Sequence, residues 1–354
     1  MITPQFLRAN PRLRQRGIPY DYGNFVADTL SILDLDPISY YDAQLSTIGY
    51  GVCNKVASWE DLGSLGLDFA QGSASLQPTY ETSTLPEIRF DSTQLMHTVS
   101  HAAMSDFTVA VLARTAEPAA GGAQSYQKPV ILSTETPGVV DDWAFYMSSG
   151  KIGLTVREGA VDLGDDTWND GNSFIYIASR DASEATADLY GSQTPFSSFT
   201  DDGTKNAGSG NTTNASYPLG VGGNGATNRT VDLNISSIVI IPKITTEAEN
   251  EIIKRQWVRE YSLNDFKFTV KTDNTGTSNS DQFTIPLYSG ETYNFTVTYD
   301  GQETTHSTDS DLTLTFPSGA GTYNVAITGT FPGLYFNNGG DKLKLTNVSS
   351  FGNV

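Results

Sequence analysis

Cysteine and histidine are scarce in this chain. One Cys and three His among 354 residues leave no material for an intramolecular disulfide, a Cys-based zinc site or a His-rich metal centre. A chain of this length allows two or three domains, each with a buried core of its own. We therefore expect a fold that is stable without covalent cross-links.

Positive charge and long apolar runs are also scarce. The 40 Asp and Glu residues outnumber the 21 Lys and Arg residues, which gives a formal net charge of −19 and disfavours a partner with a phosphate backbone. No run of about 18 apolar residues occurs, and the N-terminal stretch MITPQFLRANPRLRQRG lacks the apolar segment of a signal peptide. These absences argue against nucleic acid as a partner and against membrane insertion, and they fit synthesis in a reducing cytosol.

What the chain does contain points to β-structure. It has 33 Gly, 17 Tyr and 17 Phe residues, and its short apolar runs are separated by polar turns, a pattern typical of strands. In Asp106–Arg114 both alternating faces are apolar, which predicts a central strand that is covered on both sides. Phe174–Ala178 and Ile238–Ile241 follow the same pattern. We predict an all-β fold.

One helix is predicted, directly after an apolar closing strand at Ser237–Lys243. Thr246 and Glu249 form a T-x-x-E capping box, which marks the start of this helix. It presents a single apolar stripe at i, i+4 and i+8, formed by Ile253, Trp257 and Tyr261. Because only one side is apolar, we expect the helix to lie on the outside of a sheet.

A second unit is predicted after Asp265, where apolar residues alternate with polar ones. The segments with this period of two are Phe266–Val270, Tyr293–Tyr299, Leu312–Phe316 and Tyr323–Ile327. Four or five strands within roughly 90 residues predict a small β-sandwich with one face exposed to water. The expected division is an arm at 1–35, a larger unit at 36–264 and a smaller unit at 265–354.

Four blocks of the larger unit carry a family resemblance. They are DPISYYDAQ (Asp36–Gln44), ASWEDLGSLGLDFAQGSASLQPTY (Ala57–Tyr80), IRFDSTQLM (Ile88–Met96) and SSIVIIPKITTEAENEIIKRQWVREYSLN (Ser236–Asn264). In this order they resemble the laminin-G-like, concanavalin-A-like jelly-roll domains found in phage fibres and bacterial surface proteins. Gln77 and Ser92 depart from the family's usual Arg and Gly. The resemblance implies a jelly-roll sandwich whose first and last strands are neighbours, and it does not transfer an activity.

The smaller unit carries a second resemblance. FTIPLYSGETYNFTVTYDG and AGTYNVAITGTFPGLYFNNGGDKLKLTNVSSFG are similar to the PKD-like, immunoglobulin-like β-sandwich of bacterial surface and phage proteins. The turn at Tyr299–Gly301 stands in the place of the family's W-G-D-G turn, without its Trp and one of its Gly residues. The resemblance implies that KLKLTNVSSFG is a vestigial repeat rung or a capping strand.

The N-terminal arm is basic, although the rest of the chain is acidic. Residues 1–17 contain four arginines and no acid, and Pro4, Pro11 and Pro19 favour an extended segment. One interpretation is a solvated, frayed terminus, and the other is an anchor that orders on an acidic partner surface. The expected anchor residues are Phe6, Leu7, Arg8, Arg12, Leu13, Arg14 and Arg16.

No catalytic constellation is found in the sequence. A glycosidase needs two carboxylates about 5–9 Å apart, whereas Glu87 and Asp91 on one strand would be roughly 13 Å apart, as solvated edge residues. His97 and His101 have no G-x-S-x-G elbow nearby, and packing positions explain them. We therefore expect no enzymatic activity, with a glycan depolymerase as the minority hypothesis.

Two acidic pairs next to tryptophans are the candidate ligand-binding residues. Loop carboxylates can offer oxygen ligands to Ca²⁺, and a Trp ring can stack on a sugar or fill a sandwich core. Solvated turns explain the acids better, so no cofactor is expected, with Ca²⁺ as the open alternative. The residues are Trp143, Trp168, Asp141, Asp142, Asp165 and Asp166.

The sequence as a whole favours a non-enzymatic bacteriophage virion protein: a fibre, receptor-binding or head-decoration component. Such a protein is made in the host cytoplasm and exposed on the particle surface, which reconciles the missing export signal with modules that work outside cells. Its expected partners are other virion proteins bound through the arm, a host surface glycan and further copies of the chain, with a trimer favoured. The alternatives are a depolymerase on a jelly-roll scaffold and a bacterial surface adhesin.

Overall fold

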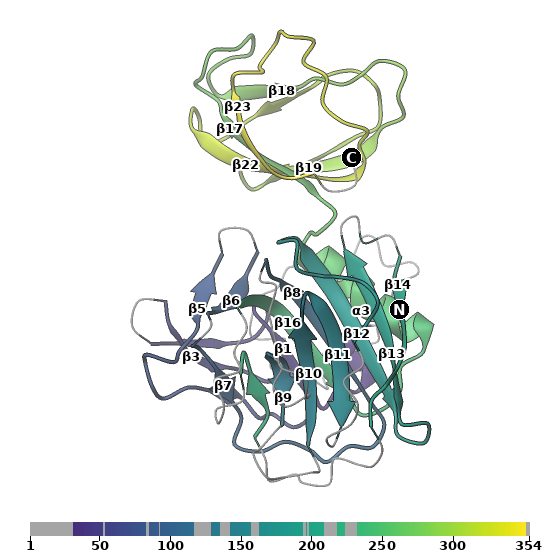
Figure 1. Cartoon of the computed structure of the whole chain (residues 1–354). Helices are drawn as coiled ribbons and strands as arrows, with labels where there is room; N and C mark the ends of the chain where they lie inside the picture. The colour runs from purple at the N-terminus through teal and green to yellow at the C-terminus, as the bar shows by residue number, and fades with distance from the viewer. Residues whose placement is uncertain are drawn as a thin grey trace.

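The computed structural model describes residues 31–51, 54–82, 85–91, 93–116, 129–134, 142–156, 163–193, 196, 198–208, 218–223 and 232–351. In these residues the fold is all-β with a single α-helix, as the sequence predicts. Figure 1 shows a larger unit and a smaller unit joined by one crossing of the chain. The larger unit comprises β1 to β16 and α3, and the smaller unit comprises β17 to β23.

The larger unit is a sandwich of two sheets, each eight-stranded in the described residues. The first sheet contains β1 (Ser39–Asp42), β5 (Thr79–Glu81), β6 (Glu87–Phe90), β8 (Phe107–Arg114), β12 (Ser173–Asp181), β13 (Thr186–Gln193), β14 (Thr200–Asn206) and β16 (Leu233–Ile241). Its order is β14-β13-β12-β8-β16-β6-β5, and β1 also pairs with β16. The opening and closing strands are therefore neighbours, as expected for the jelly-roll arrangement.

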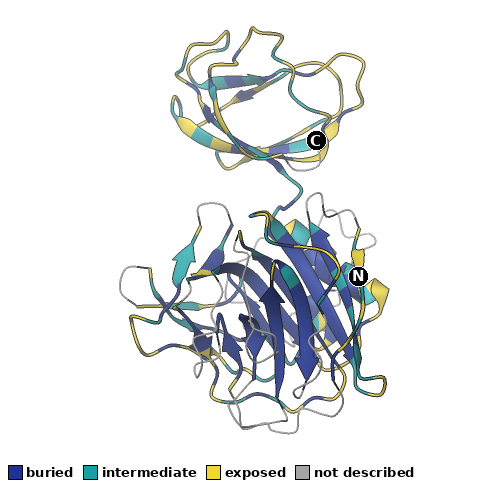
Figure 2. Cartoon of the chain, in the orientation of Figure 1, coloured by how far each residue is buried: buried dark blue, intermediate teal, exposed yellow. Residues whose placement is uncertain are grey.

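The second sheet covers the inner face of the first. It contains β2 (Ile48–Tyr50), β3 (Val56–Trp59), β4 (Phe69–Ala70), β7 (Met96–His97), β9 (Val130–Ser133), β10 (Trp143–Ser148), β11 (Lys151–Val156) and β15 (Gly220–Val221). Its order is β11-β10-β9-β15-β7-β4-β3-β2. The central strands of the two facing sheets are buried along most of their length (Figure 2).

The central strands bury both faces. On β8, Phe107, Val109 and Val111 join the core between the sheets. Ala110 and Leu112 point the other way, into a second core under the helix. The predicted two-faced central strand is confirmed, because alternation places these two sets on opposite sides of the sheet.

Helix α3 (Glu247–Glu260) lies on the outer face of the first sheet. The Thr246 side chain accepts a hydrogen bond from the Glu249 N–H, and Glu249 bonds back to the Thr246 N–H, so the capping box is present. Trp257 is fully buried in the outer core. The predicted helix and its packing face are confirmed.

The segment Trp59–Asp61, from the second of the four blocks, has a structural role. Asp61 is fully buried, and its carboxylate accepts hydrogen bonds from the N–H groups of Tyr40, Gly63 and Leu67 at 2.8, 2.8 and 3.1 Å. A Cβ on Gly63 would lie 2.6 Å from the Ser39 Cα, so only glycine fits beside β1. The segment thus fastens the loop after β3 to β1.

Part of the expected arm belongs to the larger unit. Residues Ile32–Leu35 form the 3-10 turn η1, with Ile32 and Leu35 buried in the outer core. The Ile32 N–H donates to the Gln256 side chain on α3 at 2.6 Å. The extended arm therefore does not continue to residue 35, because these apolar side chains pack under α3. Residues 1–30, with all seven expected anchor residues, lie outside the described residues.

The smaller unit contains more strands than the sequence predicts. One sheet has the order β20-β19-β22-β17-β23 and a second pairs β18 with β21. The strands are β17 (Phe266–Lys271), β18 (Gln282–Ile285), β19 (Asn294–Tyr299), β20 (Gln302–His306), β21 (Leu312–Thr315), β22 (Thr322–Thr330) and β23 (Leu345–Ser350). The expected four or five strands were too few. Strands β20 and β23 carry mostly polar, exposed side chains, and the four-residue β18, with Phe283 and Ile285 buried, was not among the segments predicted from alternation. The KLKLTNVSSFG stretch forms β23, an edge strand beside β17.

Candidate functional site

The two candidate tryptophans are core residues. Trp143 is 1% exposed and packs on Phe107 with ring centroids 5.3 Å apart. Trp168 is 5% exposed, and a Cβ on Gly191 would overlap its ring. Neither indole presents a face on which a sugar could stack, so that predicted role is wrong. The sequence could not distinguish these cases because a Trp next to a polar loop has the same pattern whether it is buried or exposed.

The loop that contains Asp165, Asp166 and Trp168 is fastened to β14 by Asp202. The buried Asp202 carboxylate accepts hydrogen bonds from Trp168 Nε1 at 3.2 Å, from the Tyr176 hydroxyl at 2.6 Å and from the Asp166 N–H at 2.6 Å. Asp202 was missed as a key residue, although the Asp201–Asp202 pair was a signal for it. This arrangement fastens the described part of the loop, residues 163–168, to β14.

The acidic candidates do not assemble into a cation site in the described residues. Asp165 is exposed and pairs with Lys205 at 2.8 Å, which lowers the pKa of its carboxyl. Asp142 is buried, and Asp141 lies outside the described residues. No three His, Cys, Asp or Glu side chains in the described part of the chain gather as metal ligands. These positions therefore give the Ca²⁺ alternative no support.

A polar hollow on the outer face of the first sheet is the best candidate site. We call it the arginine recess; its volume is about 220 Å³, and its walls include Glu81, Arg89, Arg114, Gly171, Asp232 and Asn234. Strand register places Arg89, Asn234 and Arg114 side by side across β6, β16 and β8. Their neighbours in the strands, such as Ile88 and Ile235, point into the inner core. The recess therefore lies on the outer face.

The two arginines of the recess are held differently. Glu87, which is 1% exposed, binds Arg114 through both carboxylate oxygens, with Nε to Oε2 at 2.9 Å and Nε to Oε1 at 3.1 Å. This side-chain hydrogen bonding raises the pKa of Arg114. Arg89 is 49% exposed and lies 3.5 Å from Glu81 and 4.0 Å from Asp232. Glu87 is thus a buried ion-pair partner, not the solvated edge residue that the sequence suggested.

Asn234 provides an unsatisfied donor on the recess wall. Its side chain is 9% exposed, and Nδ2 has no hydrogen-bond partner among the described residues. Buried polar groups usually find a partner, because an unpaired donor retains the cost of its desolvation. An unpaired amide beside two guanidinium groups is the feature expected of a site that receives oxygen atoms from a ligand. Sequence reasoning missed this site because its residues come from separate strands.

A larger hollow of about 860 Å³ lies between α3 and the smaller unit. Its helix side contains Glu251, Lys254 and Arg255, and its other side contains Thr298 and Thr328. Lys254 is already engaged, since its ammonium lies 2.7 Å from Glu251 and 4.9 Å from the ring centroid of Phe199. Asn264 on its wall has a buried Oδ1 without a partner in the described residues, which is an acceptor, and none of its described wall residues offers an unpartnered buried donor like Asn234 Nδ2.

Two exposed tyrosines form a separate feature on the smaller unit. Tyr288 and Tyr335 are 51% and 48% exposed, and their ring centroids are 4.9 Å apart in an edge-to-face arrangement. They come from the loop after β18 and the loop after β22. Exposed aromatic rings can contact a ligand, so this pair serves below as the competing location for binding.

A buried pair of acids fastens α3 to β1. Asp42 is fully buried and accepts hydrogen bonds from the Tyr261 hydroxyl at 2.8 Å and the Tyr40 hydroxyl at 3.3 Å. Glu260 accepts from Gln256 at 2.9 Å, while its Oε2 is buried without a hydrogen-bond partner in the described residues. Burial, reinforced by the neighbouring Asp42, raises the pKa of Glu260 to about 8.

Comparisons with known proteins find distant structural similarities alone. No family model matches it, and no curated protein matches it. The binding domain of Paraclostridial Mosquitocidal Protein 1 matches with a TM-score of 0.44 and 10% identity, over 77% of this chain and 63% of that one. An arabinofuranosidase complexed with arabinofuranosyl-alpha-1,2-xylobiose matches with a TM-score of 0.44 and 10% identity, over 72% of this chain and 60% of that one. A Trypanosoma rangeli sialidase mutant displaying trans-sialidase activity matches with a TM-score of 0.41 and 11% identity, over 64% of this chain and 33% of that one.

These similarities concern the fold alone. In each case the match spans less than two thirds of the other chain. What they share with this chain is the all-β sandwich architecture, in agreement with the sheets described above. The phage and PKD-like resemblances remain expectations from the sequence.

The expectation that the chain is not an enzyme is contradicted by these comparisons. Glycoside hydrolases, an arabinofuranosidase and a sialidase, occur among the similar structures alongside binding domains. An all-β sandwich of this kind therefore does not argue against catalysis, and the expectation is withdrawn.

Proposed function

We propose that the chain is a surface component of a bacteriophage virion that contacts a host glycan. The arginine recess carries this proposal, because it is an open, polar hollow whose wall brings an unpartnered amide donor next to two arginines. Glycans are recognised through hydroxyl groups, and side chains that both donate and accept hydrogen bonds suit them. The laminin-G-like and PKD-like resemblances of the two units support a role outside the cell.

The disposition of charge supports assembly through the N-terminus. Residues 1–17 carry four arginines and no acid, whereas the whole chain has a formal net charge of −19. An arm of this kind suits docking on an acidic neighbour, either another virion protein or another copy of the chain. Exposed ion pairs contribute only ~0–1 kcal/mol each, so the apolar residues of the arm are expected to provide most of the affinity.

Both units also suit a particle surface because they are stabilised without disulfides. Buried polar contacts hold their loops, such as Asp61 in the larger unit and Asp341 in the smaller one. A chain with one Cys can therefore fold in a reducing cytosol and function after release.

The test is the location of the chain. We expect an antibody against the purified protein to label intact phage particles in electron micrographs, and mass spectrometry of purified particles to detect the chain. Deleting residues 1–17 should leave tryptophan fluorescence unchanged and remove the chain from particles. Particles that never contain the full-length chain would contradict the proposal.

A further inference from the structure

We propose that the arginine recess binds one neutral, hydroxyl-rich sugar residue. This ligand class rests on the glycan contact proposed above and makes it specific. The inference depends on three properties of the recess: its unsatisfied donor, its charge balance and its size.

The unsatisfied donor calls for an oxygen acceptor. Asn234 is 9% exposed and its Nδ2 lacks a partner within the described structure. The register of β6, β16 and β8 places it between Arg89 and Arg114, both of which offer only N–H donors. An oxygen atom that enters the recess would therefore meet donors from three adjacent strands.

The charge balance selects a neutral ligand. Glu87 engages Arg114 with both oxygens, so this guanidinium has its counter-charge. Arg89 lies between Glu81 and Asp232. A ligand carboxylate would have to approach these two acids to reach Arg89, and like charges at short range repel.

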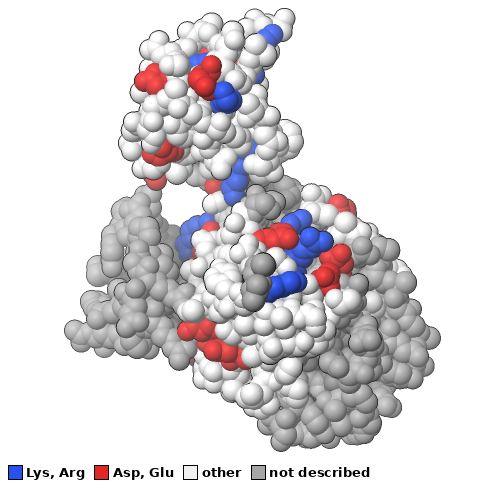
Figure 3. Space-filling model, turned by 90° about the vertical axis from the view of Figure 1, so that its left-hand side faces the viewer, with Lys and Arg blue, Asp and Glu red and all other residues white. Residues whose placement is uncertain are grey.

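A cationic ligand is disfavoured by the same arrangement. A cation would have to lie beside Arg89, which is the most exposed charged side chain of the recess. Arg89 already lies near both acids, Glu81 and Asp232. Hydroxyl groups avoid both problems, since each can donate to Glu81 or Asp232 and accept from Arg89 or Asn234. On the side of the molecule that carries β5 and β6, positive and negative side chains lie next to one another (Figure 3).

The size of the recess limits the ligand to a single residue. Its volume of about 220 Å³ corresponds to roughly seven water molecules at ~30 Å³ each. This is enough for one sugar ring, while the remainder of a glycan would extend into solvent. Pockets for larger ligands begin at about 300 Å³.

The test uses the purified full-length chain and defined probes. Methyl glycosides of glucose, galactose and mannose are compared with glucuronic acid and glucosamine by saturation-transfer NMR and calorimetry. We expect at least one neutral glycoside to bind, and the acidic and amino sugars to bind at least tenfold more weakly. Asn234→Ala and Arg89→Ala should each weaken binding at least tenfold, with tryptophan fluorescence unchanged.

Matched variants locate the site. Arg255→Ala removes an exposed arginine on α3, and Tyr288→Ala and Tyr335→Ala remove the exposed rings of the smaller unit; all three should leave binding unchanged. Preferential binding of the charged sugars would overturn the ligand class. Loss of binding in the tyrosine variants with retention in Asn234→Ala would overturn the site, and so would the absence of any sugar binding by the folded chain.

These outcomes are separable from those of the proposed function. Detection of the chain on virions without sugar binding would contradict the recess inference and leave the virion location in place. Sugar binding by a chain that never occurs in particles would support the recess and contradict the virion location.

Discussion

The larger and smaller units bury their carboxylates beside different neighbours. In the larger unit, Asp42 lies near Glu260 and Asp61 near Asp68, and burial raises the pKa of both Asp42 and Asp61. In the smaller unit, the buried Asp341 lies 4.0 Å from the ammonium group of Lys344. The comparison shows two ways of holding loops without disulfides, one among acids and the other with a cation.

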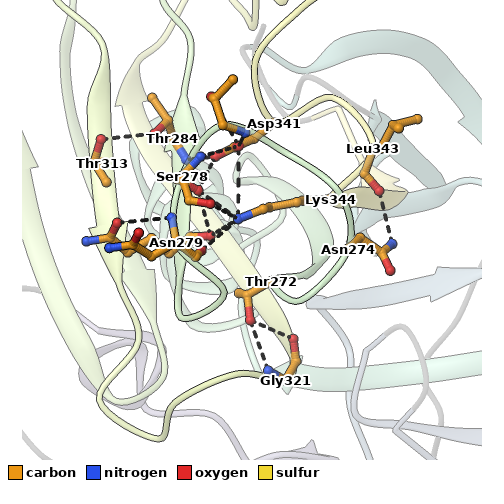
Figure 4. A network of polar contacts seen from close by, with 12 residues as sticks. Thr272, Asn274, Ser278, Asn279, Thr284, Thr313, Gly321, Asp341, Leu343 and Lys344 are labelled. Carbon is orange, nitrogen blue, oxygen red and sulfur yellow. Dashed lines mark hydrogen bonds and ion pairs between the residues drawn. The ribbon is translucent and has the colours of Figure 1, made fainter.

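The smaller unit's network is a compact polar core (Figure 4). Lys344 is 1% exposed and donates to the carbonyl oxygens of Ser278, Asn279 and Gln282 at 3.0, 2.7 and 2.9 Å. Asp341 accepts from the N–H groups of Ser278 and Thr284 at 3.0 and 2.7 Å. Burial alone would raise the pKa of Asp341, but these hydrogen bonds outweigh it and lower the pKa.

The largest expected effect tests the cation in this network. Lys344→Met leaves Asp341 buried without its cation and takes one donor from each of three carbonyl groups, so we expect the smaller unit to lose about 3–5 kcal/mol of stability. Lys342→Met, two residues away and exposed, is the control and should have little effect. Hydrogen exchange of the β17 and β22 amides measures the stability of the smaller unit in both variants. Equal exchange in the two variants would contradict the role of Lys344.

A comparable loss is expected in the larger unit when its outer core is opened. Trp257→Ala removes a fully buried side chain, and we expect a cost of about 3–5 kcal/mol. All four tryptophans of the chain lie in the larger unit, so the emission of the remaining three in urea reports its unfolding. An unfolding midpoint equal to that of Arg255→Ala, an exposed position on the same helix, would contradict the packing of α3.

A smaller effect, of pH, distinguishes the acid pair from the cation network. Because the pKa of Glu260 is raised in the folded state, its contribution to stability is present below about pH 4.5 and is lost as the pH rises toward about 8. The free energy of unfolding of Glu260→Gln should therefore equal that of the native chain near pH 4.5. Near pH 8 it should exceed that of the native chain by about 1–3 kcal/mol.

The control for this pH effect is Glu247→Gln, in the exposed first turn of α3. It should follow the native chain across the whole range in urea titrations monitored by tryptophan emission. A Glu260→Gln curve parallel to the native one would show that the acid pair does not control stability.

The smallest expected effect separates binding from stability. Arg89 is half exposed, and surface substitutions of this kind usually change stability by less than ~0.5 kcal/mol. Arg89→Ala should therefore leave the urea midpoint of the larger unit close to that of the native chain while it weakens sugar binding. A large shift in the midpoint would identify Arg89 as a structural residue of the first sheet.

The sequence predicted features that depend on local pattern. The capping box at Thr246 and the two-sided strand at Asp106–Arg114 are encoded by adjacent residues, and both are confirmed. Strand β20 was not predicted, and β23 was expected only through the family resemblance, because both are held mainly by backbone pairing and offer little apolar alternation.

The candidate site was beyond the reach of local pattern. Arg89, Arg114 and Asn234 are distant in sequence, and only the strand order places them together. Conversely, nothing in the local sequence shows whether Trp143 and Trp168 meet a ligand or fill a core, and the structure buries both. Strand order, rather than residue type, decides where this chain presents polar groups.

The most direct test of the account is to locate a neutral sugar on one unit or the other. In two-dimensional NMR spectra of the isotope-labelled full-length chain, titrated with the neutral methyl glycosides, we expect the side-chain signals of Asn234 and Arg89 to shift, together with amides of β6, β8 and β16. Signals of Tyr288 and Tyr335 should not move. Shifts confined to the tyrosine loops of the smaller unit, with the recess unchanged, would contradict the account.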